Sequence, residues 1–335
     1  MKALALASPG GLDRLSVIEM ADPGEPKRGE IRVRIHASSL NFHDLGVVAG
    51  RMPAADGRIP MSDGAGVVEA IGEGVSEFTP GDSVVSGFFP FWHGGEAAVA
   101  DFSQTPGDGI DGYAREVVVT PATHFTRAPK GYSSAEAATL TTAGLTAWRA
   151  LIVNGGLQAG DVVLALGTGG VSIFALQIAK AAGARVIVTS SSNEKLARAR
   201  ALGADHTINY RETARWASAV LEYTGGRGVD HVVEVGGAGT LPQSIEACRI
   251  CGHIALIGVL AGRGGEIPTS LLMRRQQKLQ GLIVGSRQHQ LEFVRALDGL
   301  PLRPVIDRVF PLDETAAAFR YEQAGHHFGK IALAI

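Results

Sequence analysis

The chain has 335 residues, of which 45% are hydrophobic, and its formal net charge is −2. This length predicts about two domains, and the near-neutral charge, with Lys and Arg scattered, argues against a nucleic-acid or membrane-surface partner. No apolar run is long enough for a transmembrane helix, and two cysteines without a secretion signal favour a soluble protein of the reducing cytoplasm.

The first 125 residues predict a β-rich domain. Short apolar or β-branched segments alternate with Gly- and Pro-containing turns, which is typical of strands. The expected strands are 31–37, 66–71, 82–86 and 115–119.

From about residue 133 to residue 284, strand-like and helix-like segments alternate. Such alternation predicts a parallel sheet with helices on both faces. The expected strands are 162–166, 185–189, 229–235, 253–258 and 279–284, and the expected helices are 172–182, 194–202 and 212–224.

The segment after residue 286 predicts one more helix, 311–323, and a final strand, 330–335, that pairs back with the first domain. We therefore expect an α/β protein with two domains. A doubly wound, Rossmann-like domain (126–285) is inserted into a β-rich domain (1–125 plus 286–335), and a cleft forms between them.

A glycine-rich turn joins strand 162–166 to the next helix. The strand, the turn and the helix N-terminus together present backbone N–H groups and the positive end of a helix dipole to a pyrophosphate. Ser replaces the third glycine of the dinucleotide fingerprint, at a position that mainly serves helix–strand packing. The turn predicts a dinucleotide site, and a purely structural turn is the alternative. Its residues are Gly167, Thr168, Gly169, Gly170, Val171 and Ser172.

The end of the next strand favours NADPH over NADH. An NAD site places Asp or Glu there to bind the ribose 2′-hydroxyl, whereas this chain has Ser190, Ser191 and, one helical turn later, Lys195. Hydroxyls and an ammonium suit a 2′-phosphate, which a carboxylate repels. Two alternatives stay open: residues 190–193 cap the helix that follows, or Glu194 faces the ribose.

Seven motifs recur in an order that resembles the medium-chain dehydrogenase/reductase family over essentially the whole chain. The resemblance is closest to the zinc-free quinone oxidoreductase branch and its zinc-type alcohol dehydrogenase-like bacterial relatives. It implies a GroES-like catalytic domain around a Rossmann domain, with the nicotinamide in the cleft, and we expect a homodimer. The motifs are Met1-Lys2-Ala3, DGAGVV (63–68), GDSV (81–84), the turn 167–172, ALGAD (201–205), GVD (228–230) and GKI (329–331).

The resemblance also implies roles for individual residues. Asn41 and Thr146 match polar residues close to the nicotinamide and the substrate, Lys195 matches a lysine on the 2′-phosphate, and Tyr210 matches a tyrosine near the adenosine phosphate. A helix cap for Asn41 and half-buried packing for Tyr210 stay open as alternatives. The main-chain positions expected to hold the carboxamide are Val259, Leu260, Ile283 and Val284.

The zinc ligands of the family have no counterpart in this chain. Asn41 stands where the zinc members carry a catalytic Cys, Ser62 stands where they carry His, and the stretch 141–146 lacks the third ligand. The lobe 87–112 contains no cysteine for a structural zinc. Because zinc needs three to four converging ligands, we expect no zinc.

His43 occupies the place of a proton-relay residue in the zinc members. It is a candidate for donating or accepting a proton, and a packing or surface histidine is the alternative. The aromatic run Phe88, Phe89, Phe91 and Trp92 either shapes an apolar substrate pocket or anchors its loop.

These features predict an NADPH-dependent oxidoreductase that transfers hydride to quinones, enones or related activated carbonyl compounds without zinc. Such small-molecule substrates need little polarisation by a Lewis acid. The alternatives are an NAD(P)-dependent alcohol or carbonyl dehydrogenase that uses His43 as its acid–base group, and a non-catalytic NADPH-binding protein.

Overall fold

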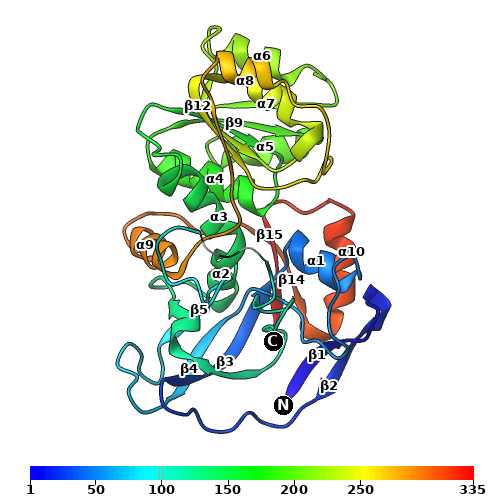
Figure 1. Ribbon diagram of the computed structural model, residues 1–335, viewed down its shortest axis with the longest axis vertical. Coiled ribbons are helices and arrows are strands. Elements are labelled where there is room, and N and C mark those ends of the chain that lie inside the picture. The colour runs from blue at the N-terminus through cyan, green and yellow to red at the C-terminus, as the bar shows by residue number, and fades with distance from the viewer. Residues whose placement is uncertain (98, 100) are drawn as a thin grey trace. The chain divides into compact units, whose positions relative to one another are not determined.

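The computed structural model describes residues 1–97, 99 and 101–335 (Figure 1). The chain forms two compact units: unit 1 is Met1–Leu145 with Val284–Ile335, and unit 2 is Thr146–Ile283. Unit 2 is thus inserted into unit 1, and it ends two residues before the boundary expected from the sequence.

The first boundary lies at residue 145 instead of 125. Helix α2 (Ser134–Ala138) explains the difference, because it packs on strands of unit 1 that include β3 (Glu30–Ser39), β4 (Ala65–Ile71) and β5 (Ser83–Ser86). A capping box between Ser133 and Glu136 begins this helix.

Unit 1 contains a seven-stranded sheet in the order β14-β15-β3-β4-β5-β7, with β6 also paired to β3. Strand β3 alternates buried and more exposed positions, so that Ile31, Val33 and Ile35 share one buried face. The final strand β15 pairs antiparallel with β3, as predicted. The remaining strands of this sheet are β6 (Val117–Pro121), β7 (Phe125–Arg127), β14 (Ile306–Pro311) and β15 (Lys330–Ala334), and a separate pair is formed by β1 (Lys2–Leu6) and β2 (Leu15–Glu19).

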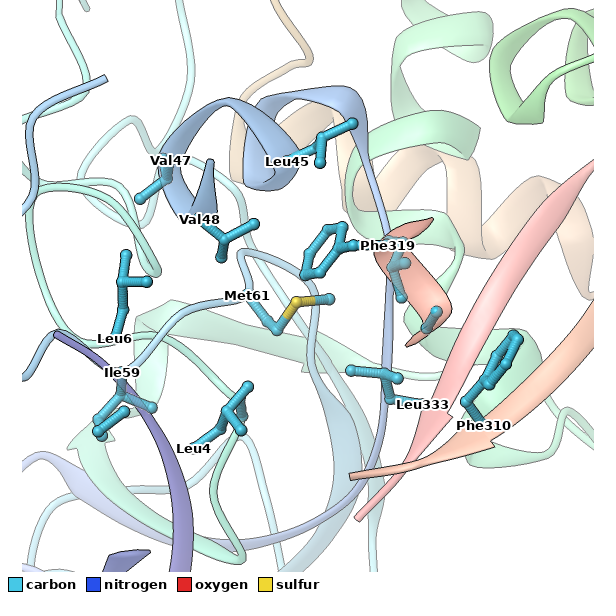
Figure 2. Packing of buried hydrophobic residues seen from close by; sticks show 14 of the residues in the cluster. Leu4, Leu6, Leu45, Val47, Val48, Ile59, Met61, Phe310, Phe319 and Leu333 are labelled. Atoms are coloured by element: carbon cyan, nitrogen blue, oxygen red, sulfur yellow. The ribbon is translucent and has the colours of Figure 1, made fainter. Parts of the chain in front are cut away.

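A second core of unit 1 lies beneath helices α1 (Phe42–Val48) and α10 (Thr315–Gln323). Figure 2 shows Val48 of α1 and Phe319 of α10 converging on Met61. Burying a side chain of this size contributes about 1.5–3 kcal/mol, so this packing fixes α1, which carries Asn41 at its N-terminus and His43 in its first turn.

Unit 2 is a six-stranded, wholly parallel sheet in the order β10-β9-β8-β11-β12-β13. All its carboxyl ends therefore meet at one edge, and the chain order reverses between β8 and β11, the switch point where doubly wound sheets bind ligands. The strands are β8 (Val162–Leu166), β9 (Arg185–Ser190), β10 (His206–Asn209), β11 (Val229–Glu234), β12 (Cys248–Leu256) and β13 (Lys278–Gly281).

The helices of unit 2 follow its strands in the alternating pattern that the sequence predicts. They are α4 (Gly170–Ala181), α5 (Asn193–Ala201), α6 (Trp216–Tyr223), α7 (Leu241–Ala247) and α8 (Thr269–Arg274), while α3 (Leu145–Trp148) begins at the unit boundary. Within the described residues, none of the helices combines the length and apolar character needed to cross a membrane.

The C-terminal segment holds two helices instead of the single one expected. The additional helix is α9 (Arg287–Leu297), which begins with a capping box between Ser286 and His289. Its buried face includes Gln290, whose Nε2 donates to the carbonyl oxygen of Ser86 at 3.0 Å. A polar residue on the buried face interrupts the helical spacing of apolar residues from which a helix is predicted.

Candidate functional site

The glycine turn of unit 2 has the geometry that a bound pyrophosphate requires. Gly167 has a φ of 78°, which side-chain-bearing residues rarely adopt, and Gly169 is the N-cap of α4 without a side chain to cap the first N–H groups. A Cβ atom built on either glycine meets no atom within 4 Å, so the space above the turn is open. The turn therefore fits the dinucleotide for which it was predicted.

Ser172 performs the packing role expected of the missing third glycine. Its side chain is buried, and its Oγ donates to the carbonyl oxygen of Leu166 at 2.6 Å, which ties α4 to the end of β8. Thr168 is also buried, and the Gly167 N–H donates to Oγ1 of Thr189 at 3.3 Å, which joins the turn to β9. Gly170 and Val171, in the first turn of α4, are half-buried.

The other predicted nucleotide residues of unit 2 follow neighbouring strands at the same edge of the sheet. Ser190 ends β9, and Tyr210 follows β10 and donates its N–H to the Ser190 carbonyl oxygen at 3.1 Å. Tyr210 is 43% exposed, so the role near the adenosine phosphate and the half-buried packing alternative both stay open. Exposed residues also follow β12 and β13 at this edge, and these are Val259, Leu260 and Ile283.

Two further predicted residues lie at the ends of the units in the chain and are buried, and their predicted roles stay predictions. Val284 belongs to unit 1 and is buried, with a φ of 43°. Thr146, the first residue of unit 2, is buried in α3.

The segment after β9 performs one of the two roles weighed for it, the helix cap, while the binding of a 2′-phosphate stays a prediction. Ser192 is the N-cap of α5, and its Oγ accepts the Lys195 N–H at 3.3 Å, so this serine does cap the helix. Ser190 is buried, and its Oγ accepts the Ser192 N–H at 3.3 Å. The side chains of Ser191 and Lys195 are half-buried, whereas Glu194 is exposed.

In unit 1, Asn41 lies in a buried network around an ammonium group. Its Oδ1 accepts a hydrogen bond from Lys330 Nζ at 2.6 Å, and Lys330 also donates to the Leu40 carbonyl oxygen. Its Nδ2 lies 2.9 Å from Asp63 Oδ2 and 3.0 Å from Asp44 Oδ2. Asn41 also occupies the N-cap position of α1, where its backbone N–H donates to Asp44 Oδ2 at 3.1 Å.

Asp63 is the most enclosed carboxylate of this network. It accepts hydrogen bonds from Ser39 Oγ at 2.5 Å and Thr142 Oγ1 at 2.6 Å, and Oδ2 lies 3.8 Å from Lys330 Nζ. Burial raises the pKa of Asp63, and the Lys330 ammonium opposes that shift. Burial likewise lowers the pKa of Lys330, which the surrounding carboxylates oppose. We call Asn41, Asp44, Asp63 and Lys330 the buried ion cluster.

Three positions of the family's zinc ligands lie in or beside this cluster. At Asn41 and Thr142 the groups facing Asp63 are an amide N–H and a hydroxyl, which donate hydrogen bonds instead of offering lone pairs to a metal. Ser62 is buried, and its N–H donates to Asp44 Oδ1 at 2.8 Å. Within the described residues, no three His, Cys, Asp or Glu side chains are arranged to hold a metal ion. The absence of zinc stays a prediction.

Of the buried ion cluster, the sequence predicted only Asn41 as a site residue. A signal was available, because Lys330 opens an otherwise apolar strand, K-I-A-L-A, in which four of the five residues are buried. A lysine in such a strand needs a buried partner.

His43 lies near the aromatic loop. Its ring is 5.4 Å from that of Phe88 and 4.5 Å from that of Phe102, between ring centroids. Phe88, Phe89 and Trp92 are buried, and Phe91 is 53% exposed. The first three rings thus anchor the loop to unit 1, which is one of the two roles predicted for them.

The parallel sheet and its open glycine turn define a two-domain, dinucleotide-binding protein. Residues 170–298 match the family described as "Zinc-binding dehydrogenase", and residues 27–130 match "Alcohol dehydrogenase GroES-like domain". The chain is 42% identical to a zinc-type alcohol dehydrogenase-like protein of Schizosaccharomyces pombe, over 97% of this chain and 96% of that protein. It belongs to the medium-chain dehydrogenase/reductase family, and the predicted fold class is confirmed.

Solved structures and longer relatives agree with this assignment. An NAD-dependent alcohol dehydrogenase is 35% identical with a TM-score of 0.90, and 100% of each chain is covered. A quinone oxidoreductase of Pseudomonas syringae pv. Tomato DC3000 is 28% identical with a TM-score of 0.82, covering 100% of this chain and 99% of that one. The chain is also 34% identical to a mycocerosic acid synthase-like polyketide synthase of Mycobacterium tuberculosis; 98% of this chain is covered, but only 15% of that relative. The protein is thus an oxidoreductase with a nicotinamide-dinucleotide-binding fold.

Proposed function

We propose that the protein is an NADPH-dependent reductase of quinones, enones or related activated carbonyl compounds. The observation that carries this proposal is the open glycine turn, followed at the end of β9 by Ser191 and Lys195, with the nearby Glu194 exposed. An ammonium and a hydroxyl favour a 2′-phosphate over a bare ribose.

The bound cofactor supplies the hydride, and the protein supplies binding and orientation. In this proposal the N–H groups at the start of α4 bind the pyrophosphate, and Lys195 binds the 2′-phosphate. Tyr210, exposed beside Ser190, flanks the adenosine.

We infer the substrate class from the buried ion cluster. In this cluster the Asn41 amide and the Lys330 ammonium are hydrogen-bonded to their neighbours. They stand at the place where a Lewis acid would polarise a carbonyl group. A substrate that is already electron-poor needs least help of that kind. The likeness to the quinone oxidoreductase supports this class.

A second candidate is an NAD(P)-dependent alcohol or carbonyl dehydrogenase. The likeness to the NAD-dependent alcohol dehydrogenase favours it, and His43 offers an acid–base group. We also propose a cytoplasmic homodimer, whose mass light scattering after size exclusion would measure.

The deciding experiment measures turnover by the purified protein at the NADPH absorbance. We expect NADPH to be oxidised with 1,4-benzoquinone or 2-cyclohexenone faster than NADP is reduced with 2-propanol, and NADPH to be used better than NADH. Oxidation of the alcohol without reduction of either acceptor would favour the dehydrogenase. Tight NADPH binding without any turnover would favour a non-catalytic binding protein.

A further inference from the structure

A second titratable side chain faces His43. The Nε2 atom of His43 lies 3.3 Å from Oδ2 of Asp108, and the two side chains are 15% and 10% exposed. The distance is that of a charge pair, although the angle is not that of a hydrogen bond. Neither atom is hydrogen-bonded to any other group of the described chain.

The surroundings of this pair are aromatic. The Phe88 ring meets His43 edge-on, the Phe102 ring lies tilted against it, and Phe89 stacks on Phe102 at 6.2 Å. Aromatic walls exclude water from the pair, and charges interact more strongly where water is scarce.

The backbone brings Asp108 to this place. A Cβ atom on Gly107, which has a φ of 83°, would lie 2.7 Å from the backbone of Met61, so only glycine allows this approach. The Asp108 N–H donates to the Thr105 carbonyl oxygen at 3.2 Å, which forms the turn that presents the carboxylate. His43 is held from the opposite side by α1, whose first turn belongs to the buried ion cluster.

We propose that Asp108 is a positioning residue that holds the proton of His43 on Nε2 and thereby assigns Nδ1 to the substrate. This inference rests on the proposed function. In reduction, the substrate carbon receives a hydride and the substrate oxygen receives a proton from Nδ1 of the imidazolium. The imidazole then regains one proton from water. In the reverse direction Nδ1 accepts the proton of the hydroxyl group.

A double-mutant cycle tests the inference. Asp108→Asn is expected to lower kcat for 1,4-benzoquinone roughly ten- to a hundredfold, with KM changed much less, because a misoriented imidazole is a poor proton carrier. In a His43→Gln background, Asp108→Asn is expected to change kcat less than about twofold, since Asp108 acts through His43. The matched control is Asp101→Asn on the same loop, whose carboxylate contacts Ser103.

An equal loss in both backgrounds, or no loss in Asp108→Asn alone, would overturn the proposal. A second measurement does not depend on turnover: ¹⁵N chemical shifts of the His43 ring report which nitrogen carries the proton. We expect the neutral ring, which remains after Nδ1 has given its proton away, to be the Nε2–H tautomer in the wild type and a mixture of both tautomers in Asp108→Asn. The same form in both proteins would overturn the pairing, even if the wild type reduces no acceptor and the proposed function has itself failed.

Discussion

The ammonium of Lys330 donates a hydrogen bond to Asn41 Oδ1 at 2.6 Å, although the two residues are 289 positions apart in the chain. The contact joins β15 to the start of α1 and leaves Asn41 with both ends of its amide bound inside the protein. Asn41 is therefore placed to orient α1 and the charged residues of the buried ion cluster. A direct contact between Asn41 and the substrate stays a prediction.

Removal of the Lys330 ammonium is expected to destabilise the protein. Lys330→Met leaves Asp63 and Asp44 buried without their cation, which costs about 3–5 kcal/mol of unfolding free energy. The control is Lys180→Met, because Lys180 pairs with Asp205 at 2.8 Å near the surface, where such a pair contributes about 0–1 kcal/mol. Urea unfolding followed by fluorescence measures the unfolding free energy of both variants. Equal losses in the two variants would show that the cluster does not depend on this charge.

The stability of the protein should depend on pH through Glu322. Burial raises the pKa of this carboxyl from 4.5 to about 8, and one of its oxygens has no hydrogen-bond partner. Between these values the folded protein holds a proton that the unfolded chain has released, so this group's contribution to stability is full below pH 4.5 and falls as the pH rises to about 8.

Glu322→Gln removes this dependence. We expect the variant to gain stability relative to the wild type as the pH rises from 5 to 8, by at most about 1.4 kcal/mol per pH unit, and the difference to level off above pH 8. Melting temperatures across this range measure the effect. Parallel pH curves for the two proteins would contradict the prediction.

Lys195 should carry most of the preference for NADPH. A hydrogen bond to a charged group contributes about 1.5–3 kcal/mol, so Lys195→Ala should weaken NADPH binding roughly ten- to a hundredfold and leave NADH nearly unchanged. Ser191→Asp should shift the preference toward NADH, because a carboxylate repels the phosphate and can accept the ribose hydroxyl. Titration of the wild type and both variants with NADPH and NADH measures these affinities. An equal loss of affinity for both nucleotides in Lys195→Ala would mean that Lys195 serves only the helix.

Gly167→Ala should weaken both nucleotides alike. An alanine at a φ of 78° costs about 1–2 kcal/mol, and relief of that strain displaces the N–H groups of the turn. Gly225→Ala is the control, because Gly225 has a φ of 62°, similar open space and a position after α6. Both variants should lose similar stability in thermal melts, but only Gly167→Ala should lose nucleotide binding. If Gly167→Ala still bound both nucleotides with the wild-type affinity, the glycine turn would not be part of the nucleotide site.

The purified protein should contain no stoichiometric zinc and should keep its activity after chelation. The reason is the donor character of Asn41 and Thr142 toward Asp63. Elemental analysis before and after dialysis against EDTA, with parallel assays, measures this. Stoichiometric zinc whose removal abolishes turnover would contradict both this prediction and the proposed chemistry.

The nucleotide turn could be predicted because its signal is local. Strand β8, the turn and α4 occupy consecutive residues, and the hydrogen bond from Ser172 to Leu166 spans only six positions. Helix α9 was missed because Gln290 interrupts its apolar face, and β14 was missed because only one of its six residues, Phe310, is buried and its last residue is a proline.

The buried ion cluster could not be predicted as a whole. Each member is an ordinary polar residue in its own segment, and periodicity does not say which polar residues meet in the interior. The pair His43 and Asp108 could not be predicted for the same reason, because a turn outside the helices and strands, Thr105–Asp108, places the carboxylate.

The position of β15 in the chain has a consequence for biosynthesis. The sheet of unit 1 needs β15 beside β3, and the ribosome makes Lys330 only after all of unit 2 has been translated. At roughly 5–20 residues per second, unit 2 alone takes on the order of ten seconds. During that interval Asp63 and Asp44 lack their cation, and the end of β3 that pairs with β15, residues 37–39, has no partner on that side. We expect the nascent chain to be a substrate for chaperones that shield unpaired strands, and unit 2 to complete its fold first.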